Sequence, residues 1–386
     1  MVLTPRSPEA DAEPCPRPLA LGIATNEPRS RYLVEALRAL GVVQAVWDFD
    51  RIDATTKLVA AALSFHPIRS EWWGRYQLHS RIQARRRANL RASIERENRP
   101  IDALLCWGSW FHPFRDLVDG PPYFNYIDQS RSLAPLEGEP HASSRGRRRS
   151  HALQAETYRD SSGILCMSEW ARAQTLDAHP STSARLHTVG WGPCAVDLSA
   201  EDHEYPRENI VLHVSNDFRR KGVDFLMATA ELVARRVPDV QFLVVGEDSR
   251  VTWARDSGPV RFLGTRRGEE LASLFRRAKV FFLPHRFDRS PHVLVEAMSA
   301  GLPLVASAQG GAVELIVNRG TGACVRVGDI DGYATAILQL LQDEPLRQMQ
   351  GAAALRVMRA NYQWSTVAGR ILAIIESVQK ARKTHQ

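Results

Sequence analysis

Residues 281–307 read FFLPHRFDRSPHVLVEAMSAGLPLVAS. The apolar runs at the two ends of this stretch predict buried strands, and HVLVEAMSAG between them predicts a helix. Ser290, Pro291 and His292 are residue types that are typical of a helix entrance. A strand, a helix and a second strand with short connections form a βαβ unit, so the stretch predicts a parallel sheet covered by helices.

The same alternation extends through both halves of the chain. In the first half, strands are predicted at 19–24, 42–49, 101–107, 122–127, 162–168 and 185–192, with helices at 30–41 and 169–179. In the second half, strands are predicted at 209–215, 240–246, 260–264, 280–284 and 303–307, with helices at 223–237, 268–278, 292–301 and 330–343. This order predicts an α/β protein with two Rossmann-like domains, whose sheets meet a ligand at a central cleft.

Composition and apolar periodicity set the expected domain boundaries. We expect a flexible leader at 1–18, a first domain at 19–200, a linker at 201–208, a second domain at 209–370, and a C-terminal helix and tail at 371–386. The leader is rich in proline and lacks an apolar period, and the linker is acidic and contains a proline.

The overall composition is that of a folded, water-soluble protein. The 386 residues are 44% hydrophobic and 24% charged, and no apolar run reaches the roughly 18 residues of a membrane-spanning helix. The first residues lack the apolar centre of a signal peptide, so a cytoplasmic location is expected. Five scattered cysteines indicate neither a disulfide framework nor a zinc site. The net charge of +7 favours anionic partners.

Two carboxylates flank the turn into the helix at 292–301. Asp288 and Glu296 lie eight residues apart, on either side of the helix entrance. Free amides and the positive end of the helix dipole suit a diphosphate, and a carboxylate further along the helix can accept hydrogen bonds from ribose hydroxyls. From spacing alone, an ordinary surface glutamate and a turn-forming aspartate are the alternative.

Two cations follow the first strand of the second half, in NIVLHVSNDFRRKG (209–222). Arg220 and Lys221 are expected at the carboxyl edge of the sheet, where they can neutralise a diphosphate leaving group. Two solvated loop charges are the alternative interpretation.

These motifs resemble the signature of glycosyltransferase family 4, an acid, seven residues, and then Glu-Ala-Met-x-(Ala/Ser)-Gly-Leu-Pro. The resemblance covers most of residues 19–380 and has motif quality at 209–324. It implies the GT-B fold and sugar transfer from a nucleotide donor with retention of configuration and no metal or other cofactor. The usual first acid is Glu, whereas this chain has Asp288. The variant at 215–222 is most similar to enzymes of lipopolysaccharide core and other surface glycans.

The resemblance also implies roles for individual residues. Arg220, Lys221 and Asp288 are the implied catalytic residues, with Asp128 as a further candidate. The implied donor-binding residues are Glu296, Ser290, Pro291, His292, Val293, Leu294, Gly246, Leu263 and Gly264. Many relatives have a His where this chain has Ile127, so Asp128 beside it is a candidate contact for the donor sugar or the acceptor. As a residue at the end of a strand, Asp128 is equally suited to capping a turn.

A basic stretch in the first half is open to three interpretations. Nine arginines lie between Arg69 and Arg99, beside Trp72 and Trp73, and Arg145–Arg149 form a second cluster in a loop-like stretch. A solvated helix, a surface for anionic lipid and a nucleic-acid surface all fit a basic run. No zinc finger or helix-turn-helix pattern supports nucleic acid, so no nucleic-acid partner is expected.

The sequence therefore favours a retaining glycosyltransferase. It is expected to move a sugar from a nucleotide-diphosphate sugar to a glycan, glycolipid or small-molecule acceptor, in surface polysaccharide or lipopolysaccharide synthesis, with peripheral contact to the inner face of a membrane. A non-catalytic GT-B protein that binds a glycan or nucleotide is the alternative. A dinucleotide-dependent oxidoreductase is disfavoured because GIATNEP (22–28) stands where a GxGxxG motif would be.

Overall fold

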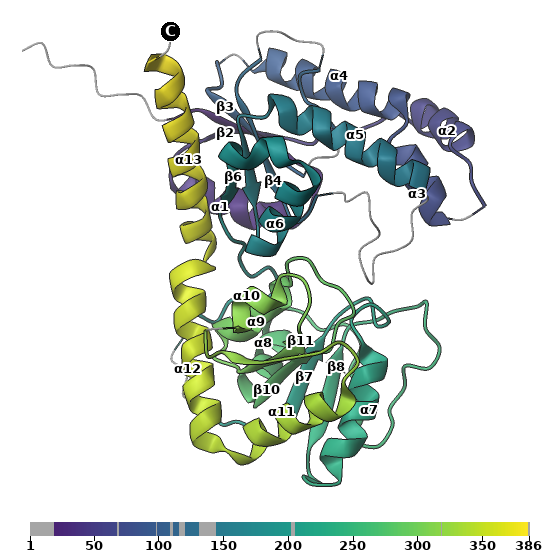
Figure 1. The fold of residues 1–386 in the computed structure, drawn as a ribbon, viewed down its shortest axis with the longest axis vertical. Helices are drawn as coiled ribbons and strands as arrows, with labels where there is room; N and C mark the ends of the chain where they lie inside the picture. Colours follow the sequence, from purple (N-terminus) through teal and green to yellow (C-terminus); the bar gives the residue numbers. More distant parts are fainter. Residues whose placement is uncertain are drawn as a thin grey trace, which may run out of the picture.

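Two parallel sheets of six strands each form the frame of the molecule (Figure 1). The computed structural model describes residues 19–67, 69–97, 99–108, 111–115, 120–130, 144–201, 205–317 and 319–384. The predicted leader at 1–18 lies outside these residues, as do positions 202–204 of the predicted linker.

The first sheet has the strand order β2-β1-β3-β4-β5-β6. Its strands are β1 (Leu21–Ala24), β2 (Val43–Trp47), β3 (Ala103–Trp107), β4 (Tyr123–Ile127), β5 (Gly163–Cys166) and β6 (Leu186–Thr188). Its helices are α1 (Ser30–Ala39), α2 (Ala54–Leu63), α3 (Arg69–Gln77), α4 (Ser80–Arg96), α5 (Ser144–Asp160) and α6 (Glu169–Ala178), with a short 3₁₀ helix at Pro180–Arg185.

The second sheet has the order β12-β11-β10-β7-β8-β9. Its strands are β7 (Ile210–Val214), β8 (Gln241–Val245), β9 (Val260–Phe262), β10 (Val280–Leu283), β11 (Leu304–Ser307) and β12 (Gly322–Val325). The helices of this half are α7 (Val223–Ala234), α8 (Gly268–Arg277), α9 (His292–Ser299), α10 (Ala312–Ile316), α11 (Ile330–Gln342) and α12 (Glu344–Asn361). The predicted α/β class with two Rossmann-like halves is confirmed.

The central strands are continuous apolar runs because helices cover both faces of each sheet. All four residues of β10 are fully buried, and Phe281 stacks on Phe275 of α8 with ring centres 5.7 Å apart. The same burial holds for β1 and β5 in the first half. The strands were predictable for this reason.

The prediction that Arg145–Arg149 lie in a loop-like stretch is wrong. They lie on the first turns of α5. The residues that α5 buries include Gln154, Thr157 and Tyr158, which are spaced by three and four positions along one helix face. Two of these three residues are polar, so the sequence of α5 lacks the regular spacing of apolar residues that would predict a helix.

Arg86 is a structural residue and does not belong to a solvent-facing basic surface. Its side chain on α4 is 2% exposed, and its Nε donates to Asp50 Oδ1 at 2.7 Å. The guanidinium also donates to Gln77 at the end of α3. A buried guanidinium needs such partners, so Arg86 joins α4, α3 and the loop after β2.

The last helix, α13 (Trp364–Thr384), returns to the first half. α12 packs on α9 of the second half, whereas α13 packs against α1. Figure 1 shows the two helices running along one side of both halves. The indole N–H of Trp364 donates to Pro193 O at 2.6 Å, so the two places where the chain passes between the halves are in contact.

A carboxylate from the second half also meets a helix end of the first. Glu314 on α10 accepts a hydrogen bond from the backbone N–H of Glu169, the first residue of α6, at 2.7 Å. Burial raises the pKa of Glu314 to about 7 from its ordinary value of 4.5. The folded state therefore holds the Glu314 proton more tightly than the unfolded chain does.

We predict that the burial of Glu314 makes the stability of the fold depend on pH between about 4.5 and 7. The contribution of Glu314 is fully present below its unfolded pKa and is lost as the pH rises through its folded pKa. Relative to Glu314→Gln, the free energy of unfolding of the wild type should fall by roughly 1–3 kcal/mol across this range, measured by urea denaturation. Glu376→Gln on an exposed face of α13 is the control, and parallel pH profiles for wild type and Glu314→Gln would contradict the prediction.

Candidate active site

A cleft of about 390 Å³ lies between the two halves. Its lining comes from segments at or after the carboxyl ends of strands of both sheets: Asn26, Glu27 and Arg29 after β1, Trp107 and Gly108 at β3, Tyr126 and Asp128 at β4, Met167 after β5, Asp217 and Arg220 after β7, and residues 287–290 and 292 after β10. Parallel strands bring their carboxyl ends to one edge, which is why residues so distant in sequence meet here.

The two predicted cations of the second half lie at this edge. Lys221 donates a hydrogen bond to Asp288 Oδ2, and the two side chains are 11% and 13% exposed. Burial alone would raise the pKa of Asp288, but the nearby positive charges, above all that of Lys221, lower it well below its usual range. The structure thus brings together two residues that the sequence had placed 67 positions apart.

Arg220 is held in place by two contacts on the wall of the cleft. Its Nε donates to Asp217 Oδ2 at 3.0 Å, and its Nη1 donates to Phe287 O at 3.0 Å. The guanidinium is therefore oriented before any ligand arrives, and its side chain is 32% exposed. A fixed, accessible cation is suited to a phosphate oxygen.

The α9 entrance has the predicted form. Pro291 is the N-cap, and no side chain caps the first turn. Ser290 lines the cleft, and its buried Oγ has no hydrogen-bond partner among the described residues. An uncapped helix start beside an unsatisfied hydroxyl leaves donors available to an anion.

Leu294, in the first turn of α9, does not offer such a donor. The N–H of Leu294 donates to Pro291 O at 3.0 Å, and its side chain is fully buried in the core. Val293 packs against the same core. The first turn of α9 therefore satisfies the Leu294 amide internally, and the contact of Leu294 and Val293 with the donor stays a prediction.

His292 occupies the cleft as a neutral imidazole. Its Nδ1 donates to Gly192 O at 2.7 Å, and burial lowers its pKa to about 4. The proton is therefore on Nδ1, which leaves Nε2 as an acceptor. The ring also stacks on Trp364, with centres 6.2 Å apart.

Glu296 has a contact that the sequence did not indicate. It does not line the cleft: its side chain is buried, and its Oε1 accepts hydrogen bonds from the backbone N–H groups of Cys194 (3.0 Å) and Ala195 (2.8 Å). Burial raises the pKa of this carboxyl. Glu296 thus ties α9 to the segment that joins the two halves, and its contact with ribose stays a prediction.

Asp128 stands directly after β4 and lines the cleft, whereas Ile127 beside it is buried in the core. The Oδ2 atom of Asp128 lies 3.5 Å from Arg289 Nη1, which forms an ion pair between the halves. Arg289 was not predicted as a site residue. No signal other than its position one residue after Asp288 could have indicated it.

Three of the implied donor-binding residues, Gly246, Leu263 and Gly264, are not on the lining of the cleft. Gly246 directly follows β8 with φ +117°, and a Cβ there would stand 1.8 Å from Ser215 O, so only glycine fits. Its N–H donates to Gly264 O at 2.9 Å. Leu263 packs partly buried against the core. These residues shape the carboxyl edge of the second sheet.

The loop after β1 supplies an ion pair that the sequence analysis missed. Arg29 donates to both carboxylate oxygens of Glu27, at 2.9 and 3.2 Å, on the wall of the cleft. The signal was present in GIATNEP, whose polar residues directly follow a buried strand. Among the described residues, no group of three or more His, Cys, Asp or Glu side chains is placed to hold a metal ion.

The chain is similar to solved structures over most of its length. Sucrose-phosphate synthase from Thermosynechococcus elongatus superposes with a TM-score of 0.66 at 17% identity, covering 94% of this chain and all of that one. WaaG, a glycosyltransferase involved in lipopolysaccharide biosynthesis, gives a TM-score of 0.62 at 16% identity, covering 92% and 99%. These likenesses confirm the fold class, GT-B with two Rossmann-like domains facing a cleft.

Sequence similarity to curated proteins is concentrated in part of the chain. A phosphatidyl-myo-inositol mannosyltransferase from Mycolicibacterium smegmatis is 35% identical over 232 residues, which are 57% of this chain. The chain covers 58% of the length of that relative. Residues 197–357, which include Arg220, Lys221, Asp288 and Glu296, match the family model described as glycosyl transferases group 1.

Proposed function

We propose that this chain is a glycosyltransferase that moves a sugar from a nucleotide-diphosphate sugar, bound mainly by the second half, to an acceptor bound mainly by the first half. The observation that carries this proposal is the placement of Arg220, Asp288 and the α9 entrance on the lining of one cleft, with Lys221 hydrogen-bonded to Asp288. All of these residues lie inside the segment that matches the group 1 model. Oriented cations beside an uncapped helix start suit a departing diphosphate.

In the proposed reaction, Arg220 and Lys221 stabilise the charge that grows on the leaving diphosphate. The ammonium of Lys221 is already positioned by Asp288, so little reorganisation is needed when a phosphate oxygen approaches. Asp288 also remains our candidate for contact with the donor sugar. Retention of configuration and independence from metal are part of the proposal, and the resemblance to family 4 supports them.

We propose a glycolipid as the acceptor class. The mannosyltransferase relative is named for phosphatidyl-myo-inositol, and the WaaG structure is titled for lipopolysaccharide biosynthesis. Asp128 and the Glu27–Arg29 pair present hydrogen-bonding groups on the first-half side of the cleft. The neutral His292 presents a further group from α9 on the second-half side. Such groups are suited to sugar hydroxyls. Synthesis of a surface glycan at the cytoplasmic face of a membrane is the proposed setting.

A panel of labelled nucleotide sugars tests this proposal. The protein should use one of GDP-mannose, UDP-glucose and UDP-N-acetylglucosamine as its donor, either by slow hydrolysis or by transfer of the sugar. The anomeric configuration of the product should be that of the donor. Activity should survive excess EDTA. Binding of a nucleotide sugar without any turnover would favour the non-catalytic alternative, and complete loss in EDTA with rescue by Mg²⁺ or Mn²⁺ would overturn the metal-independent mechanism.

Lys221→Ala should lower transfer by about 100-fold or more at saturating donor, because the diphosphate loses a charged contact in a closed site. The variant should also lose stability, since it leaves the largely buried Asp288 without its partner. The double variant Lys221→Ala with Asp288→Asn separates the two effects: it should regain thermal stability and remain inactive. Lys380→Ala, exposed on α13, is the matched control. Activity above about a third of wild type in Lys221→Ala would remove Lys221 from the mechanism.

We also propose contact with an anionic membrane through an apolar tip on α2 and α3. None of the helices in the described residues is long and apolar enough to cross a membrane. Four large apolar side chains at or beside these helices are well exposed: Leu58 (73%), Leu63 (67%), Phe65 (71%) and Trp73 (57%). Figure 1 places α2 and α3 at the end of the first half that is distant from α13. Arginines near exposed apolar groups are suited to an anionic lipid surface.

Phe65→Ser with Trp73→Ser should weaken sedimentation with phosphatidylglycerol vesicles by about tenfold, because two side chains lose their burial at the interface. The control is Met349→Ser, which removes an apolar side chain that is 59% exposed on α12 of the second half. Equal binding of both variants would contradict the membrane contact, and equal binding of the wild type to neutral phosphatidylcholine vesicles would contradict its preference for anionic lipid.

A further inference from the structure

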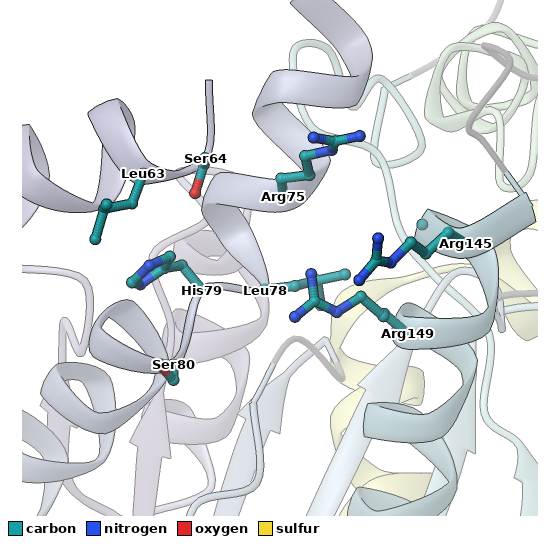
Figure 2. A pocket seen from close by; sticks show the side chains of 9 residues that line it. Leu63, Ser64, Arg75, Leu78, His79, Ser80, Arg145 and Arg149 are labelled. Carbon is teal, nitrogen blue, oxygen red and sulfur yellow. The ribbon is translucent and has the colours of Figure 1, made fainter. Parts of the chain in front are cut away.

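A second pocket, of about 360 Å³, lies in the first half and shares no lining residue with the cleft (Figure 2). It is formed where the end of α2, the end of α3, the start of α4 and the first turns of α5 meet. Its lining is Leu63, Ser64, Arg75, Leu78, His79, Ser80, Arg145, Gly146 and Arg149. The volume is in the range of small-molecule sites.

The charged side chains on the described lining of this pocket are all positive. Arg75, Arg145 and Arg149 line it, and no acidic residue is among the described lining residues. None of the three arginines forms an ion pair or hydrogen bond with another residue of the described ranges. Arg145 and Arg149 are one helical turn apart, and Figure 2 shows their guanidinium groups close together at the same side of the pocket. Like charges at this spacing destabilise a helix unless an anion compensates them.

Neutral donors complete the pocket. Ser64 is 4% exposed, and its Oγ has no hydrogen-bond partner among the described residues. Figure 2 shows this oxygen on the side of Ser64 that faces the pocket. The Nδ1 of His79 accepts a hydrogen bond from the N–H of Arg81 at 3.2 Å, so the neutral ring carries its proton on Nε2 and can donate.

We propose that this pocket binds a phosphate group, as a monoester or diester. Guanidinium groups match phosphate oxygens in geometry and charge, and the hydroxyl of Ser64 and the imidazole of His79 add hydrogen-bond donors. Leu63 and Leu78 add apolar groups to the lining, and the volume exceeds that of a phosphate alone. The ligand therefore carries its phosphate on an organic group. This site is separate from the donor site and does not depend on the proposed transfer reaction.

The phosphate has two possible sources, a soluble phosphorylated compound and a lipid headgroup. Equilibrium dialysis of the full chain with glycerol 3-phosphate tests the first. Sedimentation with vesicles of phosphatidic acid in phosphatidylcholine, against phosphatidylcholine alone, tests the second. Saturable binding in either experiment, with the variant pattern described next, supports the site and identifies its source.

Arg149→Gln should weaken binding about tenfold, the effect of removing one charged hydrogen bond. The matched control is Arg148→Gln, which removes the same charge from an exposed neighbour on α5 that does not line the pocket. Both variants leave the cleft unchanged. Arg149 also lines an adjoining pocket, and Ser64, which lines only the pocket proposed here, separates the two. Equal loss in the two variants would overturn the proposal in favour of a diffuse basic surface, and absence of saturable binding to both probes would overturn it entirely.

Ser64→Ala provides a second measurement. The variant should weaken phosphate binding by a few fold while leaving the melting temperature unchanged or higher, because the hydroxyl has no partner in the described protein. A lower melting temperature with unchanged phosphate affinity would show that Ser64 has a packing role only, and would contradict its place in the site.

Discussion

The ion pair between Lys221 and Asp288 fixes the arrangement on which the rest of the cleft depends. Lys221 belongs to the turn after β7 and Asp288 to the turn after β10, and these two strands are neighbours in the second sheet. Gly222 shows how closely these turns approach: its φ is +73°, and a Cβ there would lie 1.8 Å from Pro284 O. Because the turns are in contact, the α9 entrance and Arg220 are held at one wall of the cleft.

Most strands of the two sheets were predictable from the sequence because they are buried on both faces. Such strands are continuous apolar runs, as in β10. Helix α5 was missed because it buries Gln154 and Thr157 beside Tyr158. Arg86 looked like part of a solvated basic run, and its ion pair with Asp50 is not encoded in any local pattern. The same holds at the cleft, where the motif indicated Glu296 but not the backbone groups of residues 194 and 195 that it binds.

The two cationic regions differ in how their charge is compensated. In the cleft, Lys221 and Arg220 have carboxylate partners at Asp288 and Asp217. A ligand in the cleft has to displace these carboxylates or bind beside them. This requirement favours anions of defined shape. The arginines of the second pocket have no carboxylate partners among the described residues. An anion that binds there displaces no carboxylate, and the pocket discriminates less between anions of different shape.

The return of α13 to the first half limits how the halves can move. A body joined to another at one point can turn about any axis, whereas two separate attachments leave only the axis that passes through both. Here the attachments touch, through the hydrogen bond from Trp364 to Pro193 O. Both connections therefore pass through one place on the molecule, and a change in the width of the cleft has to bend the two of them together.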